Sequence, residues 1–152
     1  MRSLRSLALL VALTTVFAAC GRISTAPPAP TPADFQGIAT EISKRDIVID
    51  ELVSGDAGCP GNALTPTAIG LTAYGLDQST PVRLHLYIFR NRASFEKLRA
   101  SVDDCARSFI SDAETYETIE QSPFVVASQG PWAPRFEAAL RDALEVSAGT
   151  GD

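Results

Sequence analysis

Residues Val82–Phe89 have the sequence VRLHLYIF, which alternates between two kinds of side chain without a break. One set of alternate positions is aliphatic (Val82, Leu84, Leu86, Ile88), and the other is mixed (Arg83, His85, Tyr87, Phe89). Because successive side chains of a strand point to opposite faces of a sheet, this pattern predicts a strand with one aliphatic, core-facing side.

Two further strands are expected just before this one. Residues Ala68–Leu76 also alternate, and the polar turn Asp77–Pro81 is short enough to join the two runs as an antiparallel hairpin. The β-branched run Asp46–Val53 predicts another strand ahead of that hairpin.

A second hairpin is expected farther along the chain. Residues Tyr116–Gln121 and Phe124–Ser128 are both strand-like, and Gln121–Pro123 supplies the turn between them.

Three amphipathic stretches predict helices. Asp34 and Asn91 are typical N-cap residues, and Pro134 stands at a typical first-turn position. The apolar stripes that follow them at helical spacing are Phe35, Ile38 and Ile42; Phe95, Leu98, Val102, Cys105 and Phe109; and Phe136, Leu140, Ala143 and Leu144.

The resulting order of elements is α-β-β-β-α-β-β-α. Strands joined by short turns pair antiparallel by default. We therefore expect an α+β domain over residues 34–147, with three helices packed on an antiparallel sheet of about five strands. Residues 148–152 are expected to be a disordered tail.

Length and charge narrow the class of protein. A chain of 152 residues has room for one domain, and a net charge of −5 without a basic block argues against binding to nucleic acid. A single histidine excludes a zinc site with two or three histidine ligands. About 119 residues can bury enough surface for a core, so no metal or cofactor is expected.

The N-terminus has the pattern of an export signal. Arg2 and Arg5 precede the uncharged run Leu7–Ala19, which is too short to span about 30 Å of hydrocarbon but has the length of a secretory signal. The run ends in Phe17-Ala18-Ala19-Cys20, which resembles the lipobox of bacterial lipoproteins, with Phe17 in place of the usual leucine.

This resemblance implies a membrane anchor. It predicts that residues 1–19 are a signal peptide removed before Cys20, and that Cys20 carries diacylglycerol and a further acyl chain such as palmitate. The alternative is an ordinary secretory peptide with Cys20 unmodified. Residues 20–33 are rich in proline and predict an extended spacer of about 40 Å at roughly 3.1 Å per residue. The expected location is therefore extracytoplasmic, lipid-anchored to the bacterial cell membrane.

Cys59 and Cys105 remain as a pair if Cys20 is lipidated. Two cysteines in an oxidising compartment most simply form one disulfide. A redox or metal-binding role is the alternative, although neither cysteine lies in a CxxC motif or beside a histidine.

No catalytic motif is present, and we predict no catalytic residue. His85 is the only imidazole, so a serine or cysteine nucleophile would have to use it as a base. Carboxylates cluster at two places (Asp46, Asp50 and Glu51; Asp103 and Asp104), where solvated faces are the simpler interpretation.

The mixed side of the central strand is the candidate binding face. It comprises Tyr74, Arg83, His85, Tyr87 and Phe89, a combination of aromatic area and positive charge that is enriched in binding surfaces. The alternative is that a helix covers these residues as a second core layer.

The sequence therefore favours a non-catalytic lipoprotein that binds an unidentified protein or small molecule, or supports the envelope. An accessory or sensory domain that regulates a membrane partner is one alternative. A small hydrolase using His85 or paired carboxylates is the other.

Overall fold

The computed structural model describes residues 33–60 and 63–149. Its helices are α2 (Phe35–Ser43), α3 (Arg92–Ala106) and α4 (Pro134–Ala148). Its strands are β1 (Ile47–Ser54), β2 (Ala68–Gly75), β3 (Gln78–Ile88), β4 (Tyr116–Gln121) and β5 (Phe124–Gln129). The element order and the antiparallel five-stranded sheet with three helices confirm the predicted α+β fold.

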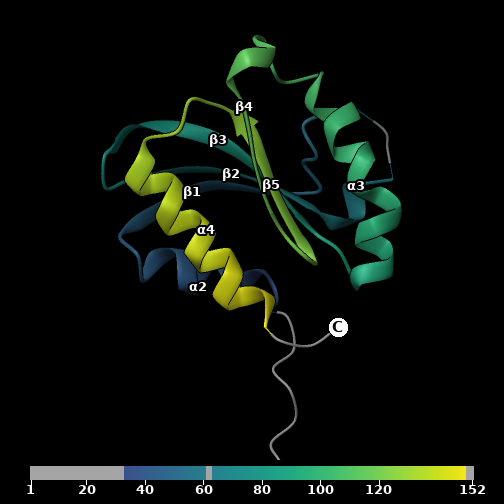
Figure 1. Cartoon of the computed structure of the whole chain (residues 1–152), viewed down its shortest axis with the longest axis horizontal. Coiled ribbons are helices and arrows are strands. Elements are labelled where there is room, and N and C mark those ends of the chain that lie inside the picture. The colour runs from purple at the N-terminus through teal and green to yellow at the C-terminus, as the bar shows by residue number, and fades with distance from the viewer. Residues whose placement is uncertain (1–32, 61–62, 150–152) are drawn as a thin grey trace, which may run out of the picture.

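The strands are arranged in the order β1-β2-β3-β5-β4, and all neighbours are antiparallel. The strand that contains the VRLHLYIF stretch, β3, therefore lies at the centre of the sheet, and β1 and β4 form its edges. The chain leaves β3 through α3, forms the far edge with β4, and returns with β5 beside β3 (Figure 1).

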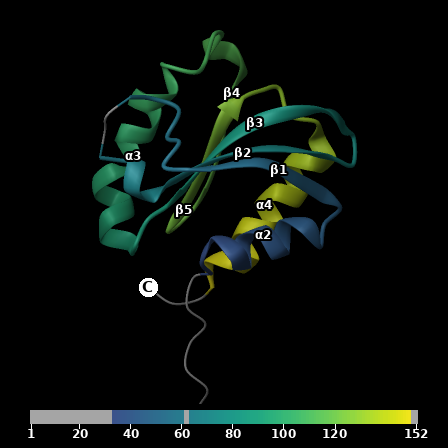
Figure 2. The same cartoon turned by 180° about the vertical axis from the view of Figure 1, so that it is seen from behind.

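Helices lie on both faces of the sheet. α2 and α4 cover one face, where Leu84 and Leu86 of β3 pack with Phe136 and Leu140 of α4 in the main core. α3 lies on the opposite side of the sheet, together with the loop that follows β1 (Figures 1 and 2). We call this second side the α3 face; its cluster includes Tyr87 and Val102.

Local capping begins α2 and α3 as expected. The Asp34 side chain accepts a hydrogen bond from the Gly37 N–H, and Asn91 accepts one from the Ser94 N–H, each at 2.9 Å. α4 begins at Pro134, and the carboxylate that accepts from its first amides belongs to Asp77 in the β2–β3 turn. A cap supplied by a distant hairpin ties α4 to the sheet.

Several boundaries differ from the sequence expectation. The β2–β3 turn contains only Leu76 and Asp77, and Pro81 lies inside β3 at a register shift, a position where a missing N–H is tolerated. α3 ends at Ala106, so Phe109 lies in the turn that follows it.

The ends of the domain also differ slightly from the expected boundaries. The Ala33 N–H donates to the Ser147 carbonyl oxygen at 2.8 Å, so the packed domain includes the last residue of the predicted spacer. Ala148, expected in the tail, is the last residue of α4.

Candidate functional site

The structure divides the predicted binding face into two parts. His85, Tyr87 and Phe89 are buried, with 4% or less of each residue exposed, whereas Tyr74 and Arg83 are partly exposed. We call His85, Tyr87 and Phe89 the covered half. The open half consists of Val48, Asp50, Thr72, Tyr74 and Arg83.

The prediction that His85, Tyr87 and Phe89 belong to an exposed binding face is therefore wrong, because these three residues are buried. Tyr87 and Phe89 form a second core layer with Val102 and Cys105 of α3, and His85 lies against Phe109, which packs on that layer. Binding through Tyr74 and Arg83 stays a prediction.

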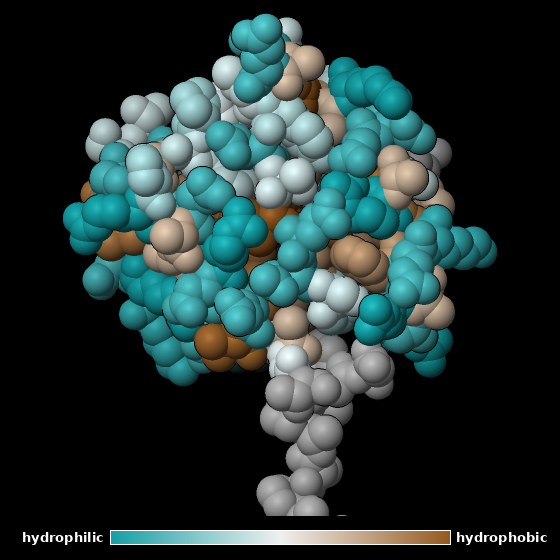
Figure 3. Space-filling model, in the orientation of Figure 1, coloured by the Kyte–Doolittle hydropathy of each residue, from teal (hydrophilic) through white to brown (hydrophobic). Residues whose placement is uncertain are grey.

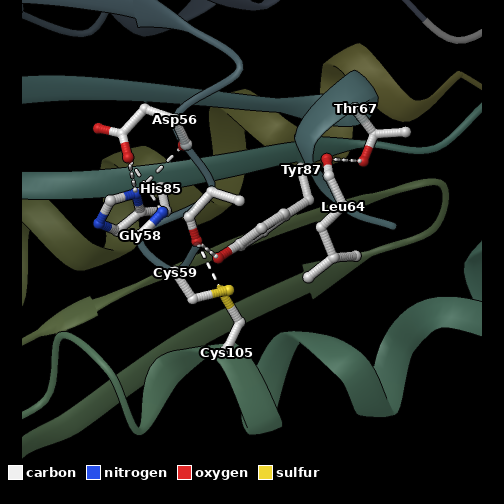
Figure 4. Close-up of a disulfide and its surroundings, with 9 residues drawn as sticks. Asp56, Gly58, Cys59, Leu64, Thr67, His85, Tyr87 and Cys105 are labelled. Carbon is white, nitrogen blue, oxygen red and sulfur yellow. Dashed lines mark hydrogen bonds and ion pairs between the residues drawn. A yellow bond between two sulfur atoms is a disulfide. The ribbon is translucent and has the colours of Figure 1, made fainter. Parts of the chain in front are cut away.

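A disulfide fastens the cover to the sheet. Cys59 in the loop after β1 is bonded to Cys105 of α3, with 5.4 Å between their Cα atoms, which confirms the predicted pairing. Below the bridge, the Tyr87 hydroxyl donates to the Ala57 carbonyl oxygen at 2.8 Å (Figure 4). The loop is therefore held from α3 on one side and from β3 on the other.

A polar cluster lies where the two halves meet. Asp56 accepts from Arg83 at 2.5 Å and, through its other carboxylate oxygen, from the Gly58 N–H at 3.0 Å. The second Arg83 nitrogen donates to the Glu51 carbonyl oxygen at 2.9 Å. Arg83 thus links the bulge of β1 to the loop that follows it.

A glycine in β2 makes room for this cluster. Gly70 is the β2 partner of His85, and a Cβ atom there would lie only 2.2 Å from an Asp56 oxygen and 2.5 Å from an Arg83 nitrogen. Because contacts that short do not occur, the Asp56–Arg83 pair requires a residue without a side chain at position 70.

The His85 imidazole is enclosed. Its Nδ1 lies 3.3 Å from the Asp56 carbonyl oxygen, and since that oxygen only accepts, Nδ1 carries the proton. The Phe109 ring lies 4.3 Å away, centroid to centroid. A Cβ atom on Gly58 would lie 2.9 Å from Nε2, so the loop backbone closes off the second nitrogen.

The environment shifts the pKa of both Asp56 and His85. Burial lowers the pKa of His85 below its ordinary value of 6.5, and contact with Asp56 offsets this only in part. For Asp56, burial alone raises the pKa, but hydrogen bonds from Arg83 and the Gly58 N–H outweigh it and the net pKa is lowered. At neutral pH the cluster therefore holds an ionised aspartate, an arginine and a neutral histidine.

The open half has a different character. Val48 of β1 is 45% exposed and stands opposite Tyr74 of β2. Asp50 stands opposite Thr72, which in turn pairs with Arg83 of β3. An aliphatic and an aromatic side chain are thus flanked by an exposed carboxylate and a fixed guanidinium, a mixture suited to binding a partner through side chains.

The predicted carboxylate pair Asp103 and Asp104 does not form a site. Asp103 accepts from the Tyr116 hydroxyl at 2.8 Å and pairs with Arg99, whereas its neighbour Asp104 pairs with Arg107. Two carboxylates occupied separately by different cations do not form an acid–base pair.

The described residues add two further observations. Among residues 33–60 and 63–149, no three His, Cys, Asp or Glu side chains are placed to hold a metal ion. None of the helices in those two ranges combines the length and the apolar character needed to cross a membrane. Cys20 and the predicted signal peptide and spacer up to residue 32 lie outside the described residues.

Sequence reasoning missed two members of the site. Asp56 has a recognisable signal, because an aspartate two residues before a glycine commonly accepts that glycine's N–H in a turn, as it does here. Val48 has no such signal, since the apolar run Ile47–Ile49 does not show which side of β1 is covered.

Comparisons of the chain with protein-family models, with curated proteins and with solved structures find no match.

Proposed function

We propose that this protein is a lipid-anchored extracytoplasmic binding domain, without catalytic activity, that contacts its partner through the open half of the α3 face. The observation that carries the proposal is the unequal cover of that face. α3 and the disulfide-fastened loop bury one half, and the other half presents Val48 and Tyr74 at the surface.

The disulfide supports an extracytoplasmic location. Disulfide bonds persist in oxidising compartments and are rare in the cytosol. Together with the lipobox-like sequence ending at Cys20, the Cys59–Cys105 bond favours export and anchoring by lipid. Removal of residues 1–19 would eliminate two arginines and change the net charge from −5 to about −7, so an anionic leaflet would repel the domain and the acyl chains would have to hold it.

The packing of His85 favours binding over hydrolysis. A general base has to reach the proton that it removes, directly or through one water. Here Nδ1 is directed at a main-chain carbonyl, and Phe109 and Gly58 enclose the rest of the ring.

Fractionation and intact-mass analysis of the full chain expressed in a bacterium test the anchoring. We expect the protein in the membrane fraction, with a mass that corresponds to cleavage before Cys20 plus added acyl chains. The Cys20→Ala variant should lack the acyl mass and leave the membrane. A membrane-free wild-type chain without acyl chains would contradict the anchor.

Site-specific photo-crosslinking in intact cells tests the binding face. A crosslinker at position 74 should give a protein or ligand adduct of defined mass, because that side chain lies on the open half. The matched control is position 146 in α4, where Val146 is 54% exposed on a different surface. Equal adducts from both positions, or none from position 74, would argue against the open half as the contact.

A further inference from the structure

The two edges of the sheet are protected to different degrees. At β4, Arg99 of α3 pairs with Glu120, and the side chain of Ile119 is fully buried. At β1, only Ile47 is buried, and Val48, Leu52 and Val53 are 45%, 53% and 48% exposed. Exposed apolar side chains on an edge strand are uncommon, because such an edge invites pairing with another chain.

The side of the molecule that carries α4 and the β4–β5 hairpin offers no comparable surface. In Figure 3 that side is mostly hydrophilic, and its apolar residues form small separate spots. Within the described part of the chain, four large apolar side chains are exposed, and three of them belong to β1. Figure 2 shows β1 from the opposite side, on the near edge of the sheet.

A groove runs beside the β1 edge. It has a volume of about 510 Å³ and lies between α2 and β1. Ala39 and Ser43 contribute one wall from α2, and Ile47, Ile49 and Leu52 contribute the other from β1. The groove therefore offers small and aliphatic surface next to the strand whose outer edge is free of a partner strand in the described structure.

The geometry suits an added strand. A strand paired to Ile47–Asp50 would point alternate side chains into the α2–β1 groove and the others along Val48 and Asp50 on the α3 face. Main-chain hydrogen bonds then supply affinity and the groove supplies selectivity, as in other cases of strand addition. Regular pairing stops at Glu51, which has a φ of 50° at the register shift between Asp50 and Val53. The recognised segment is therefore short.

Charge selects the kind of segment. Asp46, Asp50 and Glu51 are all exposed, and the structure gives none of them an ion pair with a Lys or Arg among the described residues. An incoming strand with lysine or arginine beside its apolar residues would neutralise these carboxylates. A second copy of the chain would instead bring carboxylates against carboxylates, which destabilises cross-strand pairs.

We propose that β1 and the α2–β1 groove bind a short, extended, positively charged protein segment, which adds a sixth strand at Ile47–Asp50. This inference rests on the proposed function, because it assumes a binding domain and extends its contact surface around the β1 edge from Val48.

Binding of defined peptides to the full chain in detergent tests this inference. The probe is an eight-residue peptide of alternating lysine and valine, compared with a glutamate–valine peptide and with a lysine–valine peptide whose alternate amides are N-methylated. We expect only the first to bind, and the hydrogen exchange of the Ile47–Asp50 amides to slow when it does. Both comparison peptides should bind at least tenfold more weakly.

Variants of the protein separate the groove from general attraction between opposite charges. Asp50→Lys and Ser43→Trp should each weaken binding of the lysine–valine peptide at least tenfold, by reversing the local charge and by filling the groove. Glu145→Lys makes the same charge change on exposed α4, so it should alter binding less than twofold.

Several outcomes would overturn the proposal. They are equal binding of the acidic peptide, unchanged exchange at Ile47–Asp50, an equal effect of Glu145→Lys and Asp50→Lys, or protection of β1 through self-association without peptide. Failure here, with position-74 adducts and the lipid anchor intact, would leave the proposed function standing. Loss of those adducts would instead contradict the proposed function itself.

Discussion

The covered half and the open half of the α3 face belong to the same strands but differ in what lies above them. In the covered half, Tyr87 is fully buried below the loop fastened by Cys59 and Cys105. In the open half, Tyr74 of the neighbouring strand is only partly buried and stands opposite exposed Val48 of β1. Two tyrosines on one sheet face thus have different roles, one in stability and one available for binding.

The comparison teaches that the cover, and not the strand pattern, decides which residues are available. The Asp56–Arg83 pair marks the border, because it links the loop to β3 directly above Gly70. On the α3 face, residues on the loop side of this pair are buried, whereas those on its β1 side are partly or largely exposed. Three measurements test this division.

Removal of the disulfide should have the largest effect. The Cys59→Ala/Cys105→Ala variant removes a disulfide between residues 46 positions apart. In the chain-entropy model, this removal lowers the unfolding free energy by about 4 kcal/mol. Chemical denaturation of the full chain measures the loss. Hydrogen exchange should rise first at Ala57 and Tyr87, and a uniform increase that includes β1 equally would contradict a locally fastened cover.

The two tyrosines provide a matched pair for the next largest effect. Tyr87→Phe removes the hydroxyl that donates to the buried Ala57 carbonyl, so we expect a loss of about 1–2 kcal/mol of unfolding free energy. Tyr74→Phe should change the unfolding free energy by less than about 0.5 kcal/mol, as for other surface substitutions. Similar losses from both, measured by urea denaturation, would remove the distinction between the halves.

The smallest effect is the pH dependence that His85 confers. Its pKa is lowered by burial in the folded state and is near 6.5 when unfolded, so between these values the unfolded chain binds the extra proton. The unfolding free energy should therefore be largest above about pH 7 and should decrease as the pH falls through 6.5. Since the chain has a single histidine, denaturation between pH 7.5 and 5.5 reports on this residue.

His85→Gln is the control for the pH measurement, because glutamine retains a donor near the Asp56 carbonyl and does not titrate. Its unfolding free energy should be flat over the same range. The lowered pKa of Asp56 contributes separately, through stability that is lost only at acidic pH below its ordinary value of 3.8. A wild-type slope that survives in His85→Gln would assign the effect to another group.

Much of the fold could be predicted because its signals are local. The caps at Asp34 and Asn91 act within three residues, and the hairpin turn at Ser122–Pro123 lies where the proline indicates it. The sequence pattern predicts the β2–β3 turn at Asp77–Pro81, which is too late in the chain. The turn consists of Leu76 and Asp77, and the rest of the polar run belongs to β3. Pairing at a register shift accommodated a proline that the sequence pattern treats as a strand breaker.

The site was only partly predictable, because burial of a face depends on segments that arrive from elsewhere. Phe109 closes over His85 only because the chain turns back after α3, and Asp77 caps α4 from 58 residues away. Neither relation has a periodic signature. The Asp56 turn has a local signal instead, because an aspartate is followed two positions later by a glycine whose N–H it accepts. The same spacing can be tested in other loops beside cysteine.

The sequence by itself determined which residues share a strand face, which cysteines pair, and where α2 and α3 begin, because each depends on periodicity, composition or a cap a few residues away. Only the tertiary structure decided that the disulfide-fastened loop and α3 bury His85, Tyr87 and Phe89 but leave Tyr74 and Val48 uncovered. The physical reason is that alternation fixes the direction of a side chain relative to its own sheet. Its burial depends on the area that distant segments can cover, and one helix and one loop do not cover the whole face.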